Sequence, residues 1–236
     1  MPINEILQPY ADKLNIILDK TAIKRLEKYS YMLSEWNQKM NLTAITEPYA
    51  VAIKHFADSV TLLSAVTLPY GASVIDVGTG AGFPGAVLKI ARPDLKITLL
   101  DSLQKRLSFL ENLFEELELA ADFVHQRAED AAHQEQYREQ FDLVTARAVA
   151  PLNILCELCM PFTKQDGMFA AMKGPGVQGE WMSAMMAVQE LGGIQSGIVS
   201  FNLPDASERN IVLIKKISKT SEVYPRKLIK ISKTPL

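Results

Sequence analysis

Apolar residues in the first third of the chain recur at the spacing of helices, with charged residues between them. The clearest run comprises Ile23, Leu26, Leu33, Trp36 and Met40. A second amphipathic segment follows Pro48 and extends to Leu63. We therefore expect helices here, which either pack as a cap on the main domain or recognise a substrate. The pattern does not decide between these two roles.

From Ser73 onward the pattern alternates between strand and helix. Strand-like runs occur at 73–77, 96–100, 122–125, 141–145, 168–172, 197–201 and 210–217. Helical stretches lie between them at 84–91, 103–118, 152–162 and 177–191. Strands separated by helices predict parallel βαβ units, and so an α/β fold with a mostly parallel, twisted sheet of the Rossmann type. The short link at 202–209 permits an antiparallel pair near the C-terminus.

Three regions follow from these patterns. We expect an N-terminal helical extension at 1–68, a ligand-binding α/β domain at 69–217, and a polar, basic tail at 218–236 that is poorly ordered. Residues 209–236 carry eight basic side chains and one acidic side chain, although the whole chain has a net charge of only −2. Such a run can bind a phosphate backbone, but many charge runs are only solvated surface.

Composition narrows the setting. Apolar residues make up 48% of the chain, which suits a globular protein with a sizeable core. Two cysteines cannot build a disulfide framework, and polar residues interrupt the first twenty positions. We expect a cytoplasmic protein with no membrane anchor.

A glycine-rich stretch from Val74 to Gly85 is the strongest local signal. Apolar residues and an acid run into four glycines, and Pro84 stands where a helix would begin. A buried strand, a tight turn and a helix N-terminus form a cradle for a ligand. Asp101 ends the next strand, at the offset of acids that accept hydrogen bonds from ribose hydroxyls, although it could instead cap the following helix. The pair of signals predicts an adenosine-containing cofactor.

Two such cofactors compete. The stretch from Gly80 to Gly85 matches the G-x-G-x-x-G pattern of dinucleotide-binding proteins, which would make the chain an NAD-dependent oxidoreductase. Asp76, however, stands near the turn and would repel a pyrophosphate. S-adenosylmethionine (SAM) carries a sulfonium and an ammonium group and no phosphate, so an acid beside the turn suits it. The glycine pattern from Gly78 also favours SAM.

Other reactive residue types have simpler interpretations. Cys156 and Cys159 lie in an apolar helical run and should be core residues. His125 and His133 have no partners at metal-binding spacing, so we predict no metal site.

Several motifs in a fixed order carry a family resemblance. They include Trp36-Asn37, Asn41-Leu42-Thr43, Lys54-His55, Asp58-Ser59, the glycine-rich stretch, Leu99 to Ser102, Lys105-Arg106, Arg127-Ala128-Glu129, Ala146-Arg147-Ala148 and Lys173-Gly174. The chain resembles the bacterial small-subunit rRNA guanine-N7 methyltransferase G family, also called glucose-inhibited division protein B, from about Trp36 to Ile217. The tail begins like basic extensions in that family, but has Leu-Ile-Lys-Ile where a Gly/Pro-rich turn is usual.

The resemblance implies SAM-dependent methylation of N7 of a guanine in 16S rRNA, within a small-subunit particle, by a monomer. The expected cofactor-binding residues are Gly78, Gly80, Phe83, Asp101, Ala128, Glu129 and Arg147. Ala128 and Glu129 are expected at the adenine end, and Arg147 near the cofactor and the guanine. Because guanine N7 has a free lone pair, we assign no catalytic base. A non-catalytic ribosome-binding module is a further alternative.

Some polar residues keep two interpretations. Arg147 could instead form a salt bridge with Asp101 or Glu129. Lys173 could contact rRNA at the rim of the site. His55 could touch RNA or serve only as a packing residue. Lys105 and Arg106 are expected mainly as surface charges.

Overall fold

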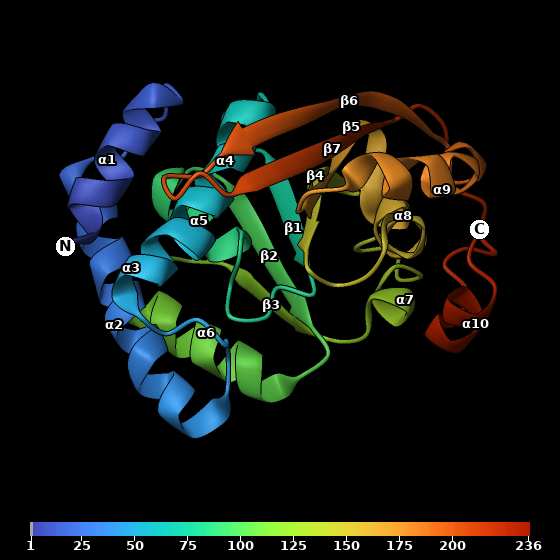
Figure 1. Cartoon of the computed structure of the whole chain (residues 1–236). Coiled ribbons are helices and arrows are strands. Elements are labelled where there is room, and N and C mark those ends of the chain that lie inside the picture. Colours follow the sequence, from blue (N-terminus) through green and yellow to red (C-terminus); the bar gives the residue numbers. More distant parts are fainter. Residues whose placement is uncertain (1) are drawn as a thin grey trace.

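A mostly parallel β-sheet forms the centre of the computed structural model, which describes residues 2–236 (Figure 1). Within these residues the sheet has seven strands: β1 (Ser73–Val77), β2 (Lys96–Asp101), β3 (Asp122–His125), β4 (Phe141–Arg147), β5 (Thr163–Lys173), β6 (Gly193–Asn202) and β7 (Glu208–Lys216). Their order across the sheet is β3-β2-β1-β4-β5-β7-β6. Strands β1 to β5 are parallel, and β7 is antiparallel to both β5 and β6. The predicted α/β fold with an antiparallel pair near the C-terminus is confirmed.

Helices cover both faces of the sheet, because alternate residues of each strand point to opposite sides. Val74 belongs to one apolar cluster and its neighbour Ile75 to the other. The first cluster includes side chains of α1 (Ile3–Lys13), α2 (Lys20–Met40), α3 (Pro48–Val51), the π-helix η1 (Ala52–Ala57), α4 (Asp58–Ala65), α5 (Gly85–Ala91) and α6 (Gln104–Glu116). The second includes side chains of α7 (Ala128–Ala131), α8 (Leu152–Cys159), the 3₁₀-helix η2 (Met160–Phe162), α9 (Val177–Glu190) and α10 (Leu228–Lys233).

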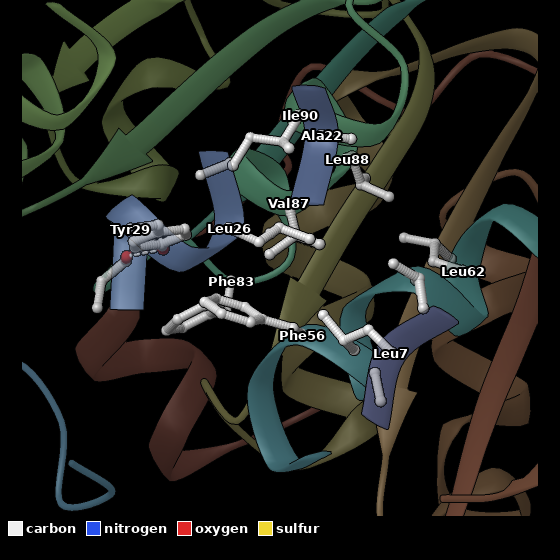
Figure 2. Close-up of a cluster of buried hydrophobic side chains, with 14 of the residues drawn as sticks. Leu7, Ala22, Leu26, Tyr29, Phe56, Leu62, Phe83, Val87, Leu88 and Ile90 are labelled. Atoms are coloured by element: carbon white, nitrogen blue, oxygen red, sulfur yellow. Dashed lines mark hydrogen bonds between the residues drawn. The ribbon is translucent and has the colours of Figure 1, made fainter. Parts of the chain in front are cut away.

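The N-terminal helices pack on α5 and close one face of the core. Figure 2 shows Leu26 and Tyr29 of α2 beside Phe83 and Val87, and all four side chains are buried. Asp19 is the N-cap residue of helix α2, because its carboxylate accepts a 2.7 Å hydrogen bond from the Ala22 amide. The predicted helical cap is therefore present, and it continues the main core.

The amphipathic segment after Pro48 is helical, as expected, but it is not one regular α-helix. It forms α3, one stretch of π-helix from Ala52 to Ala57, and then α4. A π-helical turn inserts an extra residue and rotates the side chains that follow it. His55 lies inside this turn and Asp58 directly after it, and both are buried, at 8% and 3% exposure. Apolar spacing alone does not reveal such an insertion.

The longer strands begin earlier than their apolar runs. Strand β5 starts at Thr163 and β6 at Gly193, whereas the apolar pattern begins at 168 and 197. The extra residues of β5 include exposed polar positions, and the pairing of β4 with β5 shifts register between Phe141 and Leu143. Backbone pairing thus extends beyond the residues that the apolar pattern can identify.

The C-terminal tail is not poorly ordered, and that prediction is wrong. Residues 228–233 form α10, and Ile231 is fully buried in the second apolar cluster. Arg226 pairs with the fully buried Glu157 of α8. The apolar signal of the tail is one short helix, too brief to stand out from its basic surroundings. The division of the chain at residues 68 and 217 stays a prediction.

Candidate active site

A cavity of about 400 Å³ opens where four neighbouring strands end. Its walls come, in the order of the strands across the sheet, from residues after β3, the end of β2, the loop after β1 and the end of β4. Ligands of open α/β sheets bind beyond the carboxyl ends of the strands. All seven expected cofactor-binding residues line this cavity: Gly78, Gly80, Phe83, Asp101, Ala128, Glu129 and Arg147. The structure brings them together, and their contacts with a ligand stay predictions.

Glycines shape the loop after β1. Gly78, Gly80 and Gly82 have φ angles of 72°, 60° and 100°, which favour glycine. A Cβ on Gly78 would lie 2.8 Å from a methyl group of Val149. A Cβ on Gly82 would lie 2.6 Å from the Tyr29 hydroxyl oxygen. At Gly78 the loop therefore presents backbone to the cavity at a position where a side chain would be crowded.

Asp76 holds this loop through hydrogen bonds and does not line the cavity. Its carboxylate is fully buried and accepts hydrogen bonds from the Thr79 hydroxyl at 2.7 Å and the Gly85 amide at 2.9 Å. Burial raises the pKa of Asp76 to about 6, although both hydrogen bonds lower it. Asp76 does stand beside the turn, as expected, but it does not line the cavity, so the argument that it suits a cationic ligand there is wrong.

The position of Asp76 still bears on the choice of cofactor. A dinucleotide pyrophosphate needs the free amide groups at the start of the following helix. Here the Gly85 amide, at the start of α5, already donates to Asp76. A Cβ on Gly85 would lie 2.5 Å from Leu99, so this glycine serves close packing. The match to the dinucleotide pattern thus reflects the local packing of α5 against the sheet.

Asp101 links the loop to β2. One carboxylate oxygen accepts from the Gly80 amide and the other from the Leu103 amide, each at 2.9 Å. Arg106 lies 3.2 Å from the same carboxylate and also lines the cavity, so it is more than a surface charge. The capping interpretation of Asp101 is wrong, because α6 has Leu103 at its N-cap position and no side chain caps its first turn. The ribose role of Asp101 stays a prediction.

Phe83 is packed among aromatic rings at the β4 side of the cavity. The His55 ring stacks on it at a centroid distance of 4.3 Å, and the Tyr29 ring at 5.3 Å. The guanidinium carbon of Arg147 lies 5.0 Å from the centre of the Phe83 ring. The Tyr29 hydroxyl also donates to the Ala81 carbonyl, which ties α2 to the loop. The N-terminal helices thus support the site directly.

Arg147 ends β4 and forms its salt bridge with a residue that sequence reasoning did not assign. It donates to Asp58 at 2.8 Å and to the Lys54 carbonyl at 3.1 Å. A further contact joins it to Nδ1 of His55 at 3.1 Å. Asp101 and Glu129, the partners considered earlier, are not its salt-bridge partners among the described residues. Arg147 is therefore oriented by the π-helical segment and by the first residue of α4.

His55 is neutral at physiological pH. Burial, and then the adjacent Arg147 guanidinium, lower the pKa of His55 to about 3. Its Nε2 lies 3.0 Å from the Thr43 hydroxyl. Since it is buried and stacked on Phe83, His55 acts as a packing residue that also lines the cavity.

A second cavity of about 440 Å³ lies next to the first. The two share His55, Arg147 and Ala148 as a common wall. The other lining residues of the second cavity are Ile45, Lys54, Asp58, Met172, Lys173, Gly174 and Arg209. This cavity therefore combines several cationic side chains with apolar ones, and it opens beyond β4 and β5.

Sequence reasoning missed two charged residues, and only one of them carries a sequence signal. Asp58 and Arg209 both line the second cavity, and Arg209 lies 3.5 Å from Asp58. Asp58 interrupts an amphipathic segment at a position that turns out to be buried. A charged residue within such an apolar segment is a sign of a buried ion pair. Arg209, in a strand of mixed polarity, offers no comparable signal.

Lys173 is less available than expected. Its ammonium group donates to the Ala150 carbonyl at 2.7 Å and lies 2.7 Å from a Glu180 oxygen. Only 10% of its side chain is exposed. Lys173 lines the second cavity, but its charge is used to join β5 to α9 and to the loop after β4. Contact with RNA stays a prediction for this residue.

The remaining reactive groups behave as core or surface residues. Cys156 and Cys159 are free thiols with no exposed surface, and burial raises the pKa of Cys156 to about 12. Their core role is confirmed. Across residues 2–236 no group of three or more His, Cys, Asp or Glu side chains could hold a metal ion. Over the same described range, no helix is long and apolar enough to cross a membrane.

The chain has a Rossmann-like α/β fold of the kind that solved methyltransferases share. A SAM-dependent O-methyltransferase from Thermotoga maritima matches with a TM-score of 0.54 at 16% identity, covering 80% of this chain and 72% of that one. TrmN from Thermus thermophilus matches with a TM-score of 0.53 at 15% identity, covering 67% of this chain and 48% of that one. At such identities the likeness concerns the fold.

Sequence comparison defines the family. A family profile described as rRNA small subunit methyltransferase G matches residues 22–212. A ribosomal RNA small subunit methyltransferase G of Alkaliphilus oremlandii is 48% identical, with both chains fully covered. A protein of the same description from Bacillus velezensis is 44% identical, covering 100% of this chain and 99% of its own. The chain belongs to the rRNA small subunit methyltransferase G family, and its methyl donor is SAM.

Proposed function

We propose that this chain uses SAM to methylate N7 of a guanine in small-subunit (16S) rRNA. The observation that carries the proposal is the pair of adjacent cavities with a common wall at the ends of the sheet strands. A methyl transferase needs one site for the donor and one for the acceptor, close enough for the reacting atoms to meet. Family membership supports rRNA as the acceptor.

The first cavity fits SAM. Its volume of about 400 Å³ falls in the range of cofactor sites, and it runs along the ends of four strands. Glu129 and Asp101 provide carboxylates that can accept hydrogen bonds from hydroxyl groups. Gly78 and Gly80 leave room for close approach to the backbone. Glu129 and Ala128, after β3, would lie at the adenine end, and Phe83 and Arg147 at the methyl end.

The second cavity fits a nucleotide that has left its stack. Enzymes that modify a base must reach it in an exposed strand or flip it out. Lys54 and Arg209 line this cavity and can approach a phosphate backbone, while Ile45 and Met172 can contact a base face. Arg147 stands at the common wall, where its guanidinium can donate to O6 of a guanine, the acceptor next to N7. N7 then remains free to react.

The chemistry asks little of the protein beyond positioning. SAM supplies an electrophilic methyl group, and guanine N7 supplies the lone pair that receives it. The new bond joins N7 to the methyl carbon as the carbon–sulfur bond breaks, so the positive charge moves to the base. Because N7 carries no proton, no side chain need act as a base. The neutral state of His55 suits this site, since a second cation would oppose the charge on the base.

Place and partners follow from this substrate. We infer that the chain acts in the cytoplasm, as a monomer, on rRNA within a small-subunit particle. Incubating purified chain and labelled SAM with naked 16S rRNA and with purified particles separates the two substrates. Faster labelling of the particle supports the inference, whereas labelling of naked rRNA alone contradicts it.

Mass spectrometry of small-subunit rRNA tests the proposed reaction. Deletion of the gene should remove one 7-methylguanosine, and the wild-type gene should restore it. The Gly78→Asp gene should not restore it, because a carboxylate would enter the cavity from a position with φ of 72°. Unchanged 7-methylguanosine in the deletion strain would overturn the proposal. If Gly78→Asp corrects the deletion phenotype without methylation, the chain acts as a ribosome-binding module.

A further inference from the structure

The C-terminal tail reaches the cofactor cavity through Leu228. This side chain lines the cavity together with Leu158 of α8 and Ala128 of α7. The tail, residues 218–236, is distant in sequence from every other lining residue, the next nearest being Leu158. In Figure 1, α10 lies beside α7 and α8 at one end of the molecule. One wall of the cavity therefore comes from the last residues of the chain.

Two arginines hold the tail in place. Arg138 donates to the carbonyl groups of Thr220 and Tyr224, each at 2.9 Å, and of Ser221 at 3.1 Å. Such bonds fix the backbone path irrespective of the side chains in the tail. The chain between β7 and α10 is thereby anchored to the main domain.

The second arginine forms a buried ion pair. Arg226 contacts Glu157 through Nε at 2.8 Å and through its terminal nitrogen at 2.6 Å, and its backbone amide donates to the same carboxylate at 2.8 Å. Glu157 has no exposed surface. A fully buried carboxylate with one cationic partner makes removal of that partner costly. The pair fixes the residue two positions before Leu228.

Local contacts set the direction of Leu228. Lys227 lies 2.6 Å from Asp130 of α7, which places the start of α10 beside the residues that follow β3. Ile231, three residues after Leu228, is fully buried in the second apolar cluster. Residues three apart lie on the same side of a helix, so Leu228 and Ile231 share the inner side of α10. Ile229, in contrast, is 73% exposed.

We propose that Leu228 forms part of the adenine site, so that the C-terminal tail is a component of cofactor binding. This inference rests on SAM occupying the first cavity, as in the proposed function. Leu228 and Ala128 line the same cavity, and the ion pair between Lys227 and Asp130 places Leu228 toward its β3 end. Arg147 ends β4, which lies three strands away across the sheet. The flat, weakly polar ring of adenine suits a wall of Leu158, Ala128 and Leu228.

Calorimetric binding of S-adenosylhomocysteine and of adenosine tests the inference. Leu228→Ala should weaken both ligands by a similar factor, roughly tenfold, since a trimmed apolar contact in a ligand pocket costs about that much. Leu228→Met keeps the volume and should bind as the wild type does. Ile229→Ala is the matched control, because it removes an exposed side chain from the same helix.

A second readout separates binding from folding. Hydrogen exchange of the amides in residues 220–233 should slow when S-adenosylhomocysteine binds to the wild-type chain, and slow less in Leu228→Ala. The unliganded variants should melt at similar temperatures, because Leu228 is only partly buried. If Leu228→Ala binds both ligands as tightly as Ile229→Ala, the inference is wrong. If the wild-type chain binds neither ligand, that result contradicts the proposed function itself, and not only the role of Leu228.

Discussion

Arg147 is the residue on which the two cavities converge. It lines both, stacks over Phe83, and is held by Asp58 on the side away from the cofactor residues. Burial raises the pKa of Asp58, and the Arg147 and Arg209 guanidinium groups oppose that rise. A carboxylate kept between two arginines fixes their directions more firmly than backbone contacts alone. Asp58 is thus a positioning residue for Arg147.

Replacing Asp58 with Asn should slow methylation by roughly 10–100-fold, the cost of misplacing a group that orders the reactants. Binding of S-adenosylhomocysteine should change much less, because Asp58 lines only the second cavity. Single-turnover methylation and calorimetry measure the two effects. Asp166→Asn is the control, since it alters a surface ion pair whose acid is 77% exposed. Equal losses of binding and rate would contradict a positioning role.

His55 should make stability depend on pH in a defined direction. Its pKa is about 3 in the folded chain and near 6.5 when unfolded. Between these values the unfolded chain binds a proton that the folded chain does not, so His55 makes stability rise with pH across this window. Above it, the contribution is constant.

Urea unfolding of the wild type and His55→Gln at several pH values measures this effect. The difference in unfolding free energy should increase in favour of the wild type from about pH 3 to 6.5 and then level off. His125→Gln, at an exposed position, controls for the chemical change. A difference that does not vary with pH would show that His55 titrates alike in both states.

At the level of the elements, the β1–loop–α5 unit joins stability to ligand binding. Asp76 fixes the loop through Thr79 and fixes the start of α5 through Gly85. Helix α5 can approach the sheet closely only because Gly85 has no side chain. One glycine-rich stretch therefore leaves the cavity open at Gly78 and Gly80 and allows close packing at Gly85.

Gly85→Ala should destabilise the fold by about 1–3 kcal/mol through overpacking, because its Cβ would lie 2.5 Å from Leu99. Gly179→Ala, in α9, meets no atom within 4 Å and should stabilise the fold by about 0.5–1 kcal/mol. Chemical denaturation of both variants measures the contrast. A neutral Gly85→Ala would mean that α5 can shift away from β2.

The elements also show how far the sequence is informative. Short, nearly continuous apolar runs locate β1 to β5, because strands that are buried on both faces of the sheet are apolar at most positions. Amphipathic stretches between these runs indicate helices. The glycine turn and Asp101 lead to the cavity, since both depend on local geometry. The Asp58–Arg147 contact joins residues 89 positions apart, so local spacing does not encode it. The π-helical turn is local, but the apolar spacing does not reveal it either. The sequence does not show that Asp76 is buried and absent from the cavity lining, because a buried acid and a ligand-facing acid look alike in sequence.

At the scale of the whole molecule, most basic residues of the C-terminal region form ion pairs within the chain. Of the eight basic residues in this region, five have an acidic partner within the described chain: Arg209, Lys215, Lys216, Arg226 and Lys227. Lys216 is fully buried. The basic residues that suggested phosphate binding thus have a partly structural use. Their ion pairs with acidic residues help to hold β7 and the C-terminal tail against the remainder of the chain.

The N-terminal helices and the sheet should unfold together, since one continuous apolar cluster includes both. The two tryptophans report on opposite faces: Trp36 packs on Phe109, and Trp181 packs against the second cluster. In Trp36→Phe and Trp181→Phe variants, the remaining tryptophan should show the same urea midpoint. An earlier midpoint for Trp36 would show that the helices form a separate unit.

The strand order has a consequence for synthesis. Among residues 2–236, β6 pairs with β7 alone, and β7 inserts between β5 and β6 although it is the last strand made. While the chain is still being translated, β6 leaves the ribosome with no strand beside it, and β5 has an open edge until residue 216 has emerged. Completion of the sheet therefore waits for nearly the whole chain. The strands whose ends form the cavity therefore belong to a sheet that is complete only when almost the whole chain has left the ribosome.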